Sequence, residues 1–226
     1  MKVTIEDIAR KVGKSITTVS RALNDYPDVS PETKALVRRI ADELGYSPSM
    51  LAQRLQKQRT DTIGLVVPTY EPRMVDPFFS EFSAGVSKQA AEDGFDLLVT
   101  TSLTGEDDTR VYHDIAKSGR VDGFIIARTK VNDARIRYLR EIAFPFTSFG
   151  RTSGDSEYPF VDVDSYSGMR SLVDHLVMLG HRSFAAITAP LDLNFSMQRL
   201  SGIQDALQQH GLSIGAEHRL SGNLTQ

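Results

Sequence analysis

Apolar residues at the start of the chain follow a helical pattern that predicts two short helices separated by a tight turn. In the first helix they recur on one face: Ile5, Ile8, Ala9 and Val12. Thr4, followed by Asp7 three residues later, is typical of an N-cap. Gly13 is expected to end this helix, because glycine adopts the left-handed conformation at little cost. Ser15 then caps a second helix that runs to about Asn24.

The second predicted helix has two unlike sides. Val19, Ala22 and Leu23 lie on one side and are expected to pack on the first helix. The other side carries Ile16, Thr17, Ser20, Arg21 and Asn24, with Thr18 at the boundary. Two short helices joined by a glycine turn, the second with a polar outer side, are typical of a helix-turn-helix. A plain helical hairpin has the same pattern.

A third helix is predicted between two clear end signals. Ser30 is an N-cap, Pro31 suits the first turn, and Gly45 follows the last turn. The expected buried stripe is Leu36, Val37, Ile40 and Leu44. Residues 47–55, SPSMLAQRL, form two turns at most. A helix that short is marginal in water, so we expect it to order only against DNA and a second copy.

Beyond residue 61 the apolar pattern changes from helical stripes to short runs rich in branched and aromatic residues. The expected strands are IGLVVP, FDLLVT, GFIIAR, PFTSFG and FAAITA. Helical stretches separate them at about 78–93, 105–118, 132–142, 165–180 and 195–210. Alternation of strands and helices predicts a parallel sheet covered on both faces. Such sheets bind ligands at the carboxyl ends of their strands.

Charge separates the two parts of the chain. Residues 1–60 hold 11 Lys+Arg against 7 Asp+Glu, whereas residues 61–226 hold 15 against 22. A basic first part suggests a polyanionic partner, although such a fluctuation is common over a short window. The chain contains no cysteine, which fits a reducing compartment. The opening MKVTIEDIARKVGKS has no apolar run long enough for a signal peptide, so we expect a cytoplasmic protein.

Motifs for catalysis or cofactors are weak. Gly13-Lys14-Ser15 matches the last three residues of a phosphate-binding loop. However, Ile8 occupies the position at which that loop needs another glycine, and the preceding segment is a predicted helix rather than a strand. The histidines at 113, 175, 181, 210 and 218 have no metal-ligand spacing, and no nucleophile-elbow or dinucleotide motif occurs. Asp162 and Asp164 lack a partnering carboxylate motif. We therefore expect neither an enzyme nor a cofactor.

Three stretches of the first part carry a specific resemblance: TVSRALN at 18–24, VSPET at 29–33 and LGYSPSMLAQRL at 44–55. With the residues between them, from Val3 to Leu55, they resemble the headpiece of the LacI/GalR family of bacterial transcription regulators. Lys14 departs from that pattern, in which an apolar residue is usual. IGLVVP, DPFFSEFSAGV, RVDGFII, FVDVDSYSGM and HLVMLGHRSFAAI resemble the family's effector-binding core, which is similar to periplasmic sugar-binding proteins.

The resemblance implies a small all-α helix-turn-helix headpiece followed by an α/β parallel-sheet core of two lobes. The expected boundaries are 1–46 for the headpiece, 47–61 for a hinge helix and linker, 62–160 for the first lobe and 161–226 for the second. Family cores continue further, so we expect the second lobe to be incomplete.

The resemblance also assigns DNA contacts. Ile16, Thr17 and Arg21 would read base edges, and Arg21 is best suited to guanine. The remaining expected DNA-contact residues near the helices, mostly at phosphates, are Thr4, Ser15, Thr18, Ser20 and Asn24. Leu55, apolar in basic surroundings, corresponds to the leucine that the family inserts into the minor groove. The alternative is that Leu55 packs on the core.

A small-molecule effector is implied between the lobes. The expected lining residues are Phe78, Phe79, Asp164, Leu193, Phe195 and Arg199. Both phenylalanines could belong to the core, but we expect Phe78 to face the ligand. Asp164 either contacts the ligand or caps a helix. Without the resemblance, Arg199 would be taken as an ordinary solvated charge on a helix surface. Leu193 stands where the purine-responsive member has an arginine, which favours a neutral ligand, most simply a sugar.

The function expected from the residues and the resemblance together is a homodimeric repressor of a carbohydrate-use operon that binds double-stranded operator DNA. The alternative is a sugar-binding module that does not bind DNA.

Overall fold

The structure is a computed structural model that describes residues 3–46, 59–69, 77–103, 108–154 and 157–222. The chain divides into two compact units, Met1–Gln58 and Arg59–Gln226. The finer boundaries expected within these units remain predictions.

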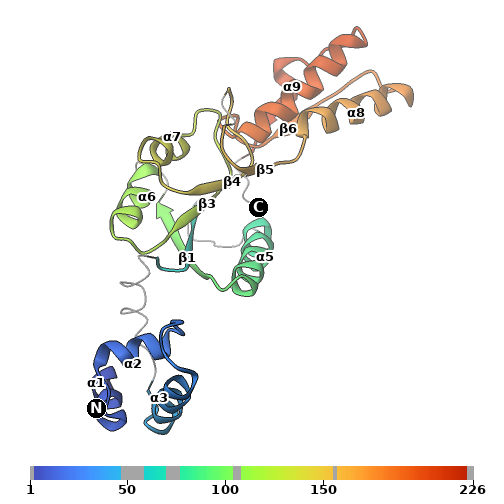
Figure 1. Ribbon diagram of the computed structural model, residues 1–226. Helices are drawn as coiled ribbons and strands as arrows, with labels where there is room; N and C mark the ends of the chain where they lie inside the picture. Colours follow the sequence, from blue (N-terminus) through green and yellow to red (C-terminus); the bar gives the residue numbers. More distant parts are fainter. Residues whose placement is uncertain (1–2, 47–58, 70–76, 104–107, 155–156, 223–226) are drawn as a thin grey trace. The chain divides into compact units, whose positions relative to one another are not determined.

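Within residues 3–46, the first unit contains three helices whose ends lie where the cap residues predict (Figure 1). They are α1 (Ile5–Val12), α2 (Ile16–Leu23) and α3 (Pro31–Glu43). Gly13 ends α1 with a left-handed φ of 69°. The Ser15 and Ser30 hydroxyls accept hydrogen bonds from the backbone N–H groups of Thr18 and Thr33 and so cap α2 and α3.

A small core holds the three helices together. Ile8, Val19, Ala22 and Val37 have no exposed surface, so each helix contributes to the same apolar centre. Of the stripe predicted for α3, Val37 and Ile40 belong to this core, whereas Leu36 and Leu44 are only partly buried at its edge. Ala41, which the stripe did not include, is also buried, because it lies four residues from Val37 on the same side of the helix.

The second unit is built on the predicted parallel sheet. Among the residues that the structure describes, five strands of this sheet pair in the order β2-β1-β3-β4-β5, all parallel. They are β1 (Thr62–Thr69), β2 (Asp96–Leu103), β3 (Gly123–Ala127), β4 (Phe146–Phe149) and β5 (Phe160–Val161). The helices are α5 (Pro77–Glu92), α6 (Asp108–Lys117) and α7 (Ala134–Glu141). Figure 1 shows α5 on one face of the sheet and α6 and α7 on the other, which confirms a sheet covered on both sides.

The last part of the second unit forms a smaller layer. Two parallel strands, β6 (Ala186–Thr188) and β7 (Arg219–Ser221), accompany the helices α8 (Ser165–Met178) and α9 (Asn194–Gln209), and a short 3₁₀ turn spans Ala216–His218. The predicted strand at FAAITA is therefore shorter than its apolar run. Neither β5 nor β7 was predicted, because two or three residues are too few to show a strand pattern.

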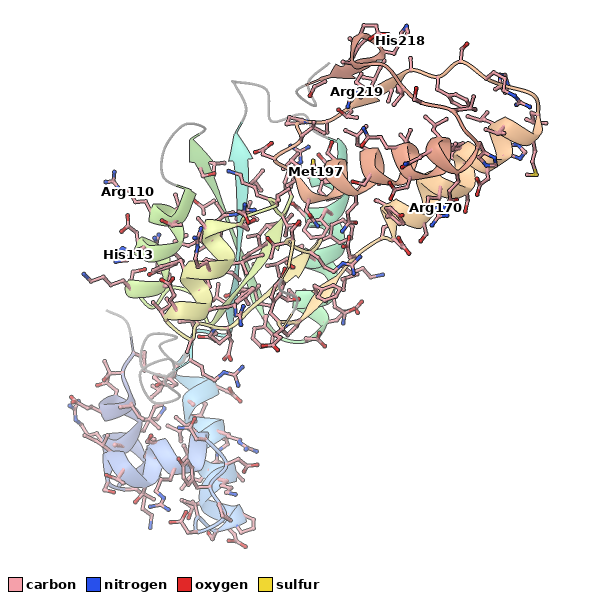
Figure 2. The ribbon with its side chains drawn as sticks, turned by 90° about the horizontal axis from the view of Figure 1, so that it is seen from above. Arg110, His113, Arg170, Met197, His218 and Arg219 are labelled. Atoms are coloured by element: carbon pink, nitrogen blue, oxygen red, sulfur yellow. The ribbon has the colours of Figure 1, made fainter. Side chains whose placement is uncertain are left out.

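Helices α8 and α9 lie side by side, as Figure 2 shows around Arg170 and Met197. Three polar contacts join them: the Tyr166 hydroxyl donates to Asp205, Arg170 Nη2 donates to Gln209 Oε1, and His210 Nε2 lies 2.7 Å from Asp174 Oδ1. At Gly202 the close approach leaves no room for a side chain. A Cβ at this position would overlap the carbonyl oxygen of Tyr166 and lie 3.2 Å from Cβ of Met169.

Replacing Gly202 with alanine is therefore expected to push α8 and α9 apart and destabilise the second unit by about 1–3 kcal/mol, despite the better helix propensity of alanine. Urea unfolding followed by circular dichroism measures this change. Gly168→Ala is the matched control, because Gly168 lies in α8 with nothing within 4 Å of its virtual Cβ. That variant should gain about 0.5–1 kcal/mol. Equal stability changes in the two variants would contradict the packing argument.

Candidate nucleic-acid interface and effector site

The side of α2 that carries Ile16, Thr17, Ser20, Arg21 and Asn24, here called the outward side, faces away from the three-helix core as the apolar pattern predicts. Val19 and Ala22 are buried in the three-helix core, which fixes the rotation of α2 about its own axis. Ile16, Thr17, Arg21 and Asn24 are consequently exposed, while Thr18 and Ser20 are half-buried. Ile16 is 48% exposed, which is unusual for an isoleucine on a unit whose other branched apolar residues are largely buried. The arrangement brings one apolar and several hydrogen-bonding side chains onto a single helical surface.

Several of the predicted DNA-contact residues also stabilise helix ends. The Ser15 and Thr18 hydroxyls are hydrogen-bonded to each other at 2.8 Å. Asn24 Nδ2 donates to the carbonyl of Ser20 at 2.9 Å. Thr4 donates from its backbone N–H and its hydroxyl to the carboxylate of Asp7. These hydrogen bonds lower the pKa of Asp7 below its ordinary value. The four side chains therefore have a structural role in the protein alone.

Arg21 is held by two residues that the sequence pattern did not single out. Its Nε donates to Asp28 Oδ1 at 3.1 Å, and its Nη2 lies 2.7 Å from Asp28 Oδ2. The guanidinium carbon lies 5.1 Å from the centroid of the Tyr26 ring. Both partners come from the turn after α2, and nothing in the helical pattern of α2 indicates which turn residue would reach back to it.

A second carboxylate in the same turn has different partners. Asp25 Oδ1 lies 2.9 Å from Lys34 Nζ and 3.2 Å from Arg38 Nη2, both on α3. The hydrogen bond from Lys34 and the charges of Lys34 and Arg38 lower the pKa of Asp25. Leu55, the predicted minor-groove residue, lies outside the described residues.

The two predicted effector residues of α5 differ in exposure, one being buried and the other exposed. Phe79 is 7% exposed, and the Arg128 guanidinium carbon lies 4.9 Å from its ring centroid. Phe78 is 36% exposed and stacks on Phe82 with ring centroids 5.4 Å apart. Phe149, at the carboxyl end of β4, lies 5.8 Å from Phe78 and 5.4 Å from Phe82. Phe82 and Phe149 thus join a cluster of three aromatic rings that the sequence did not predict.

The other predicted effector residues lie at the start of α8 and α9. Leu193 is 2% exposed, so its side chain packs in the interior at the start of α9 and does not form part of the surface. Phe195 carries the Arg199 guanidinium carbon 4.9 Å from its ring centroid. Asp164 accepts a hydrogen bond from the backbone N–H of Ser167 at 2.9 Å, which lowers its pKa. The helix-capping role of Asp164 is therefore present; a contact with ligand stays a prediction.

Hydrogen bonds tie the start of α9 to the carboxyl end of β3. Asn194 N donates to Thr129 O at 2.9 Å, and Val131 N donates to Asp192 O at 2.8 Å. The Ser153 hydroxyl donates to the buried side chain of Asn194 at 2.8 Å. The start of α9 thus lies directly beside the strand ends at which parallel sheets bind ligands.

A buried ion pair anchors the turn between β3 and α7. Asp133 accepts from Arg135 Nε at 2.9 Å and from Arg135 Nη2 at 2.6 Å, and it also caps α7. Arg135 Nη2 donates in turn to the carbonyl of Arg128, whose φ of 52° is left-handed. Burial by itself would raise the pKa of Asp133, but the hydrogen bonds and charge of Arg135 hold it below its ordinary value.

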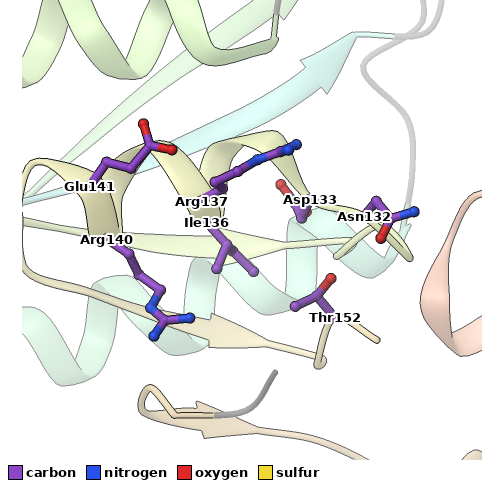
Figure 3. A pocket seen from close by; sticks show the side chains of 7 residues that line it. All are labelled: Asn132, Asp133, Ile136, Arg137, Arg140, Glu141 and Thr152. Carbon is purple, nitrogen blue, oxygen red and sulfur yellow. The ribbon is translucent and has the colours of Figure 1, made fainter. Parts of the chain in front are cut away.

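A hollow of about 530 Å³ lies beside this turn (Figure 3). Its lining residues are Asn132, Asp133, Ile136, Arg137, Arg140, Glu141 and Thr152. None of the predicted effector residues lines it. Because most of its lining residues lie in α7 or at its N-cap, we do not assign the effector to it.

Two negative findings concern only the residues that the structure describes. Among them, no helix is long and apolar enough to cross a bilayer. Nor does any group of three or more acidic, histidine or cysteine side chains there form a potential metal site.

Solved structures resemble the chain across nearly its whole length. The lac repressor dimer bound to operator and the anti-inducer ONPF gives a TM-score of 0.80 at 25% identity, covering 100% of this chain and 67% of that one. The CelR–cellobiose complex gives a TM-score of 0.65 at 30% identity, covering 99% and 67%.

Relatives of known name are similar over most of this chain. The HTH-type transcriptional regulator AglR of Rhizobium meliloti is 40% identical over 215 residues, which are 95% of this chain and 60% of that protein. RafR of Escherichia coli is 34% identical over 212 residues, 92% and 62% respectively. The chain therefore spans less than two thirds of the length of these two relatives.

Family models match both units. Residues 4–49 match the model described as bacterial regulatory proteins, lacI family, and residues 60–223 match the periplasmic binding proteins and sugar binding domain of LacI family. The second match alone extends over more than half of the chain. This protein belongs to the lacI family of bacterial regulatory proteins.

Proposed function

We propose that this chain is a transcription regulator that recognises operator DNA through the outward side of α2. The observation that carries the proposal is the exposure of Ile16, Thr17 and Arg21 side by side on a helix fixed by a buried core. A short helix presented in this way enters the major groove, where side chains of these kinds meet base edges. The named relatives, which are HTH-type regulators, support the same function.

The effector in this proposal is a small molecule, most simply a sugar, bound beside the strand ends of the second unit. The exposed ring of Phe78 and the Phe195–Arg199 pair would supply an aromatic surface and hydrogen-bond donors, as small-molecule sites require. Asp164 would border this site, while Phe79 and Leu193 would support it from the core. The CelR neighbour, solved with cellobiose, and the match to a sugar-binding domain support a carbohydrate.

Regulation would follow from linkage between the two sites. Two copies would place their α2 helices in successive major-groove segments of a palindromic operator. A sugar that binds one arrangement of the second unit more tightly than another would shift the protein toward that arrangement. The resulting change in affinity for DNA is limited by the difference between the sugar's affinities for the two arrangements. The protein would thus act in the cytoplasm as a repressor, by binding rather than by catalysis.

Fluorescence anisotropy with a labelled duplex tests this function. We expect the logarithm of the association constant to fall linearly with the logarithm of the salt concentration, because basic side chains displace counterions from the phosphates. Adding cellobiose and other mono- and disaccharides should then change the affinity for at least one of them. A folded protein that binds no duplex at low salt would contradict the DNA function. DNA binding that no sugar alters would contradict the carbohydrate effector alone.

A further inference from the structure

The guanidinium of Arg21 is fixed on two sides before any DNA is present. Asp28 holds one edge of the plane through two contacts, Nε to Oδ1 at 3.1 Å and Nη2 to Oδ2 at 2.7 Å. Tyr26 lies against the guanidinium at 5.1 Å from its ring centroid. One contacted edge and a ring beside it leave a planar, rigid group with little rotational freedom.

The edge that Asp28 occupies is not the end of the side chain. A guanidinium has five N–H donors, and Asp28 engages Nε and one N–H of Nη2. No residue in the described range 3–46 accepts a hydrogen bond from Nη1. The free end therefore presents parallel N–H groups of Nη1 and Nη2. Guanine offers the matching pair of acceptors, O6 and N7, in the major groove.

The carboxylate of Asp28 also disfavours contacts between Arg21 and DNA phosphates. Asp28 is about half-exposed, so its charge remains close to the surface that would meet DNA. A negative charge there repels phosphates and weakens binding to every sequence equally. It also lowers the gain when Arg21 swings away to a phosphate, because that movement would break the surface ion pair with Asp28. Such an arrangement lowers the affinity for all DNA but increases the difference in affinity between DNA sequences.

We propose that Asp28, assisted by Tyr26, is a positioning residue that makes Arg21 selective for guanine. This inference rests on the proposed DNA-binding function and adds to it the source of selectivity at one base pair. It assigns no direct base contact to Asp28: the carboxylate acts through the orientation of the guanidinium.

Two variants of equal charge change separate positioning from simple electrostatics. Asp28→Asn removes the carboxylate that holds Arg21. Asp25→Asn removes a carboxylate from the same turn, but its partners are Lys34 and Arg38 on α3. The whole chain and both variants are used to select sites from a random duplex pool. Affinities are then measured on the selected site, on the same site with its most strongly preferred guanine replaced, and on unrelated duplex DNA.

Both variants are expected to bind unrelated DNA more tightly than the parent protein, since each removes one negative charge. Only Asp28→Asn should lose preference for guanine, by about fivefold or more, a part of what one bidentate contact provides. Unchanged preference in Asp28→Asn, or an equal loss in Asp25→Asn, overturns the inference. If the parent protein selects no sequence at all, the proposed function itself fails, and that result is distinct from either outcome.

Discussion

Replacing Asp133 with alanine is expected to lower the free energy of unfolding of the second unit by about 3–5 kcal/mol, the usual cost of leaving a buried charge without its partner. The side chains of Arg135 and Asp133 are only 7% and 0% exposed, so water cannot replace the lost carboxylate. The backbone N–H groups of Lys130 and Arg135 would lose their acceptor as well. Urea unfolding at neutral pH measures the loss.

Asp164→Ala is the matched control for that variant. Both aspartates cap a helix, Asp133 at α7 and Asp164 at α8, but only Asp133 also neutralises a buried guanidinium. We expect a clearly smaller loss of stability in Asp164→Ala. If the two variants lose the same amount, the capping hydrogen bond explains the effect and the buried pair contributes nothing beyond it.

The same ion pair gives a pH dependence whose sign can be worked out. The native pKa of Asp133 is lowered, so its contribution is complete above the pKa of the unfolded chain, roughly 4, and is lost as the pH falls through the native value. The stability difference between the parent protein and Asp133→Ala should therefore narrow in acid. Unfolding measured at a series of pH values from neutral downward checks this. A difference that stays constant or widens would contradict the assignment.

The second large effect is expected at Arg21. Arg21→Ala should weaken binding to a selected operator by about 1–3 kcal/mol for each copy of the contact and relax the preference for one base pair. The reason is the exposed end of a guanidinium that Asp28 and Tyr26 hold in one orientation. Titrations of parent and variant on matched and substituted operators measure both quantities.

Arg10→Ala is the control for Arg21→Ala. Arg10 is an exposed arginine on α1 whose ion pair is with Asp7, so it carries the same charge away from the outward side of α2. Its loss should leave the base preferences unchanged, whatever it does to overall affinity. Identical preferences in the parent and in Arg21→Ala would show that Arg21 does not read a base.

Local patterns predicted the helices and their ends well, because a cap depends on residues only a few positions apart. Ser15, Ser30 and Gly13 each have the predicted cap geometry, and Val19 and Ala22 are buried as their spacing requires. The rotation of α2, and hence its exposed side, followed from the same spacing. The parallel sheet was also predictable, because its strands are apolar runs separated by helices.

Contacts between distant or irregular segments could not be predicted in this way. Asp28 meets Arg21 only because the turn after α2 folds back, and no periodic pattern describes a turn. Phe149 joins Phe78 across a sheet and a helix that are far apart in sequence. β5 and β7 exist through pairing with β4 and β6, which their few residues do not reveal. Under the proposal above, preference for guanine would depend on one such contact, that between Asp28 and Arg21.

Selection from a random duplex pool tests most directly whether the outward side of α2 reads DNA sequence. The whole chain is incubated with the pool at moderate salt, and the bound fraction is amplified and sequenced over several rounds. We expect enrichment of a short site that contains a strongly preferred guanine, present as an inverted repeat when two copies bind together. A folded protein that retains DNA but enriches no sequence would contradict the claim.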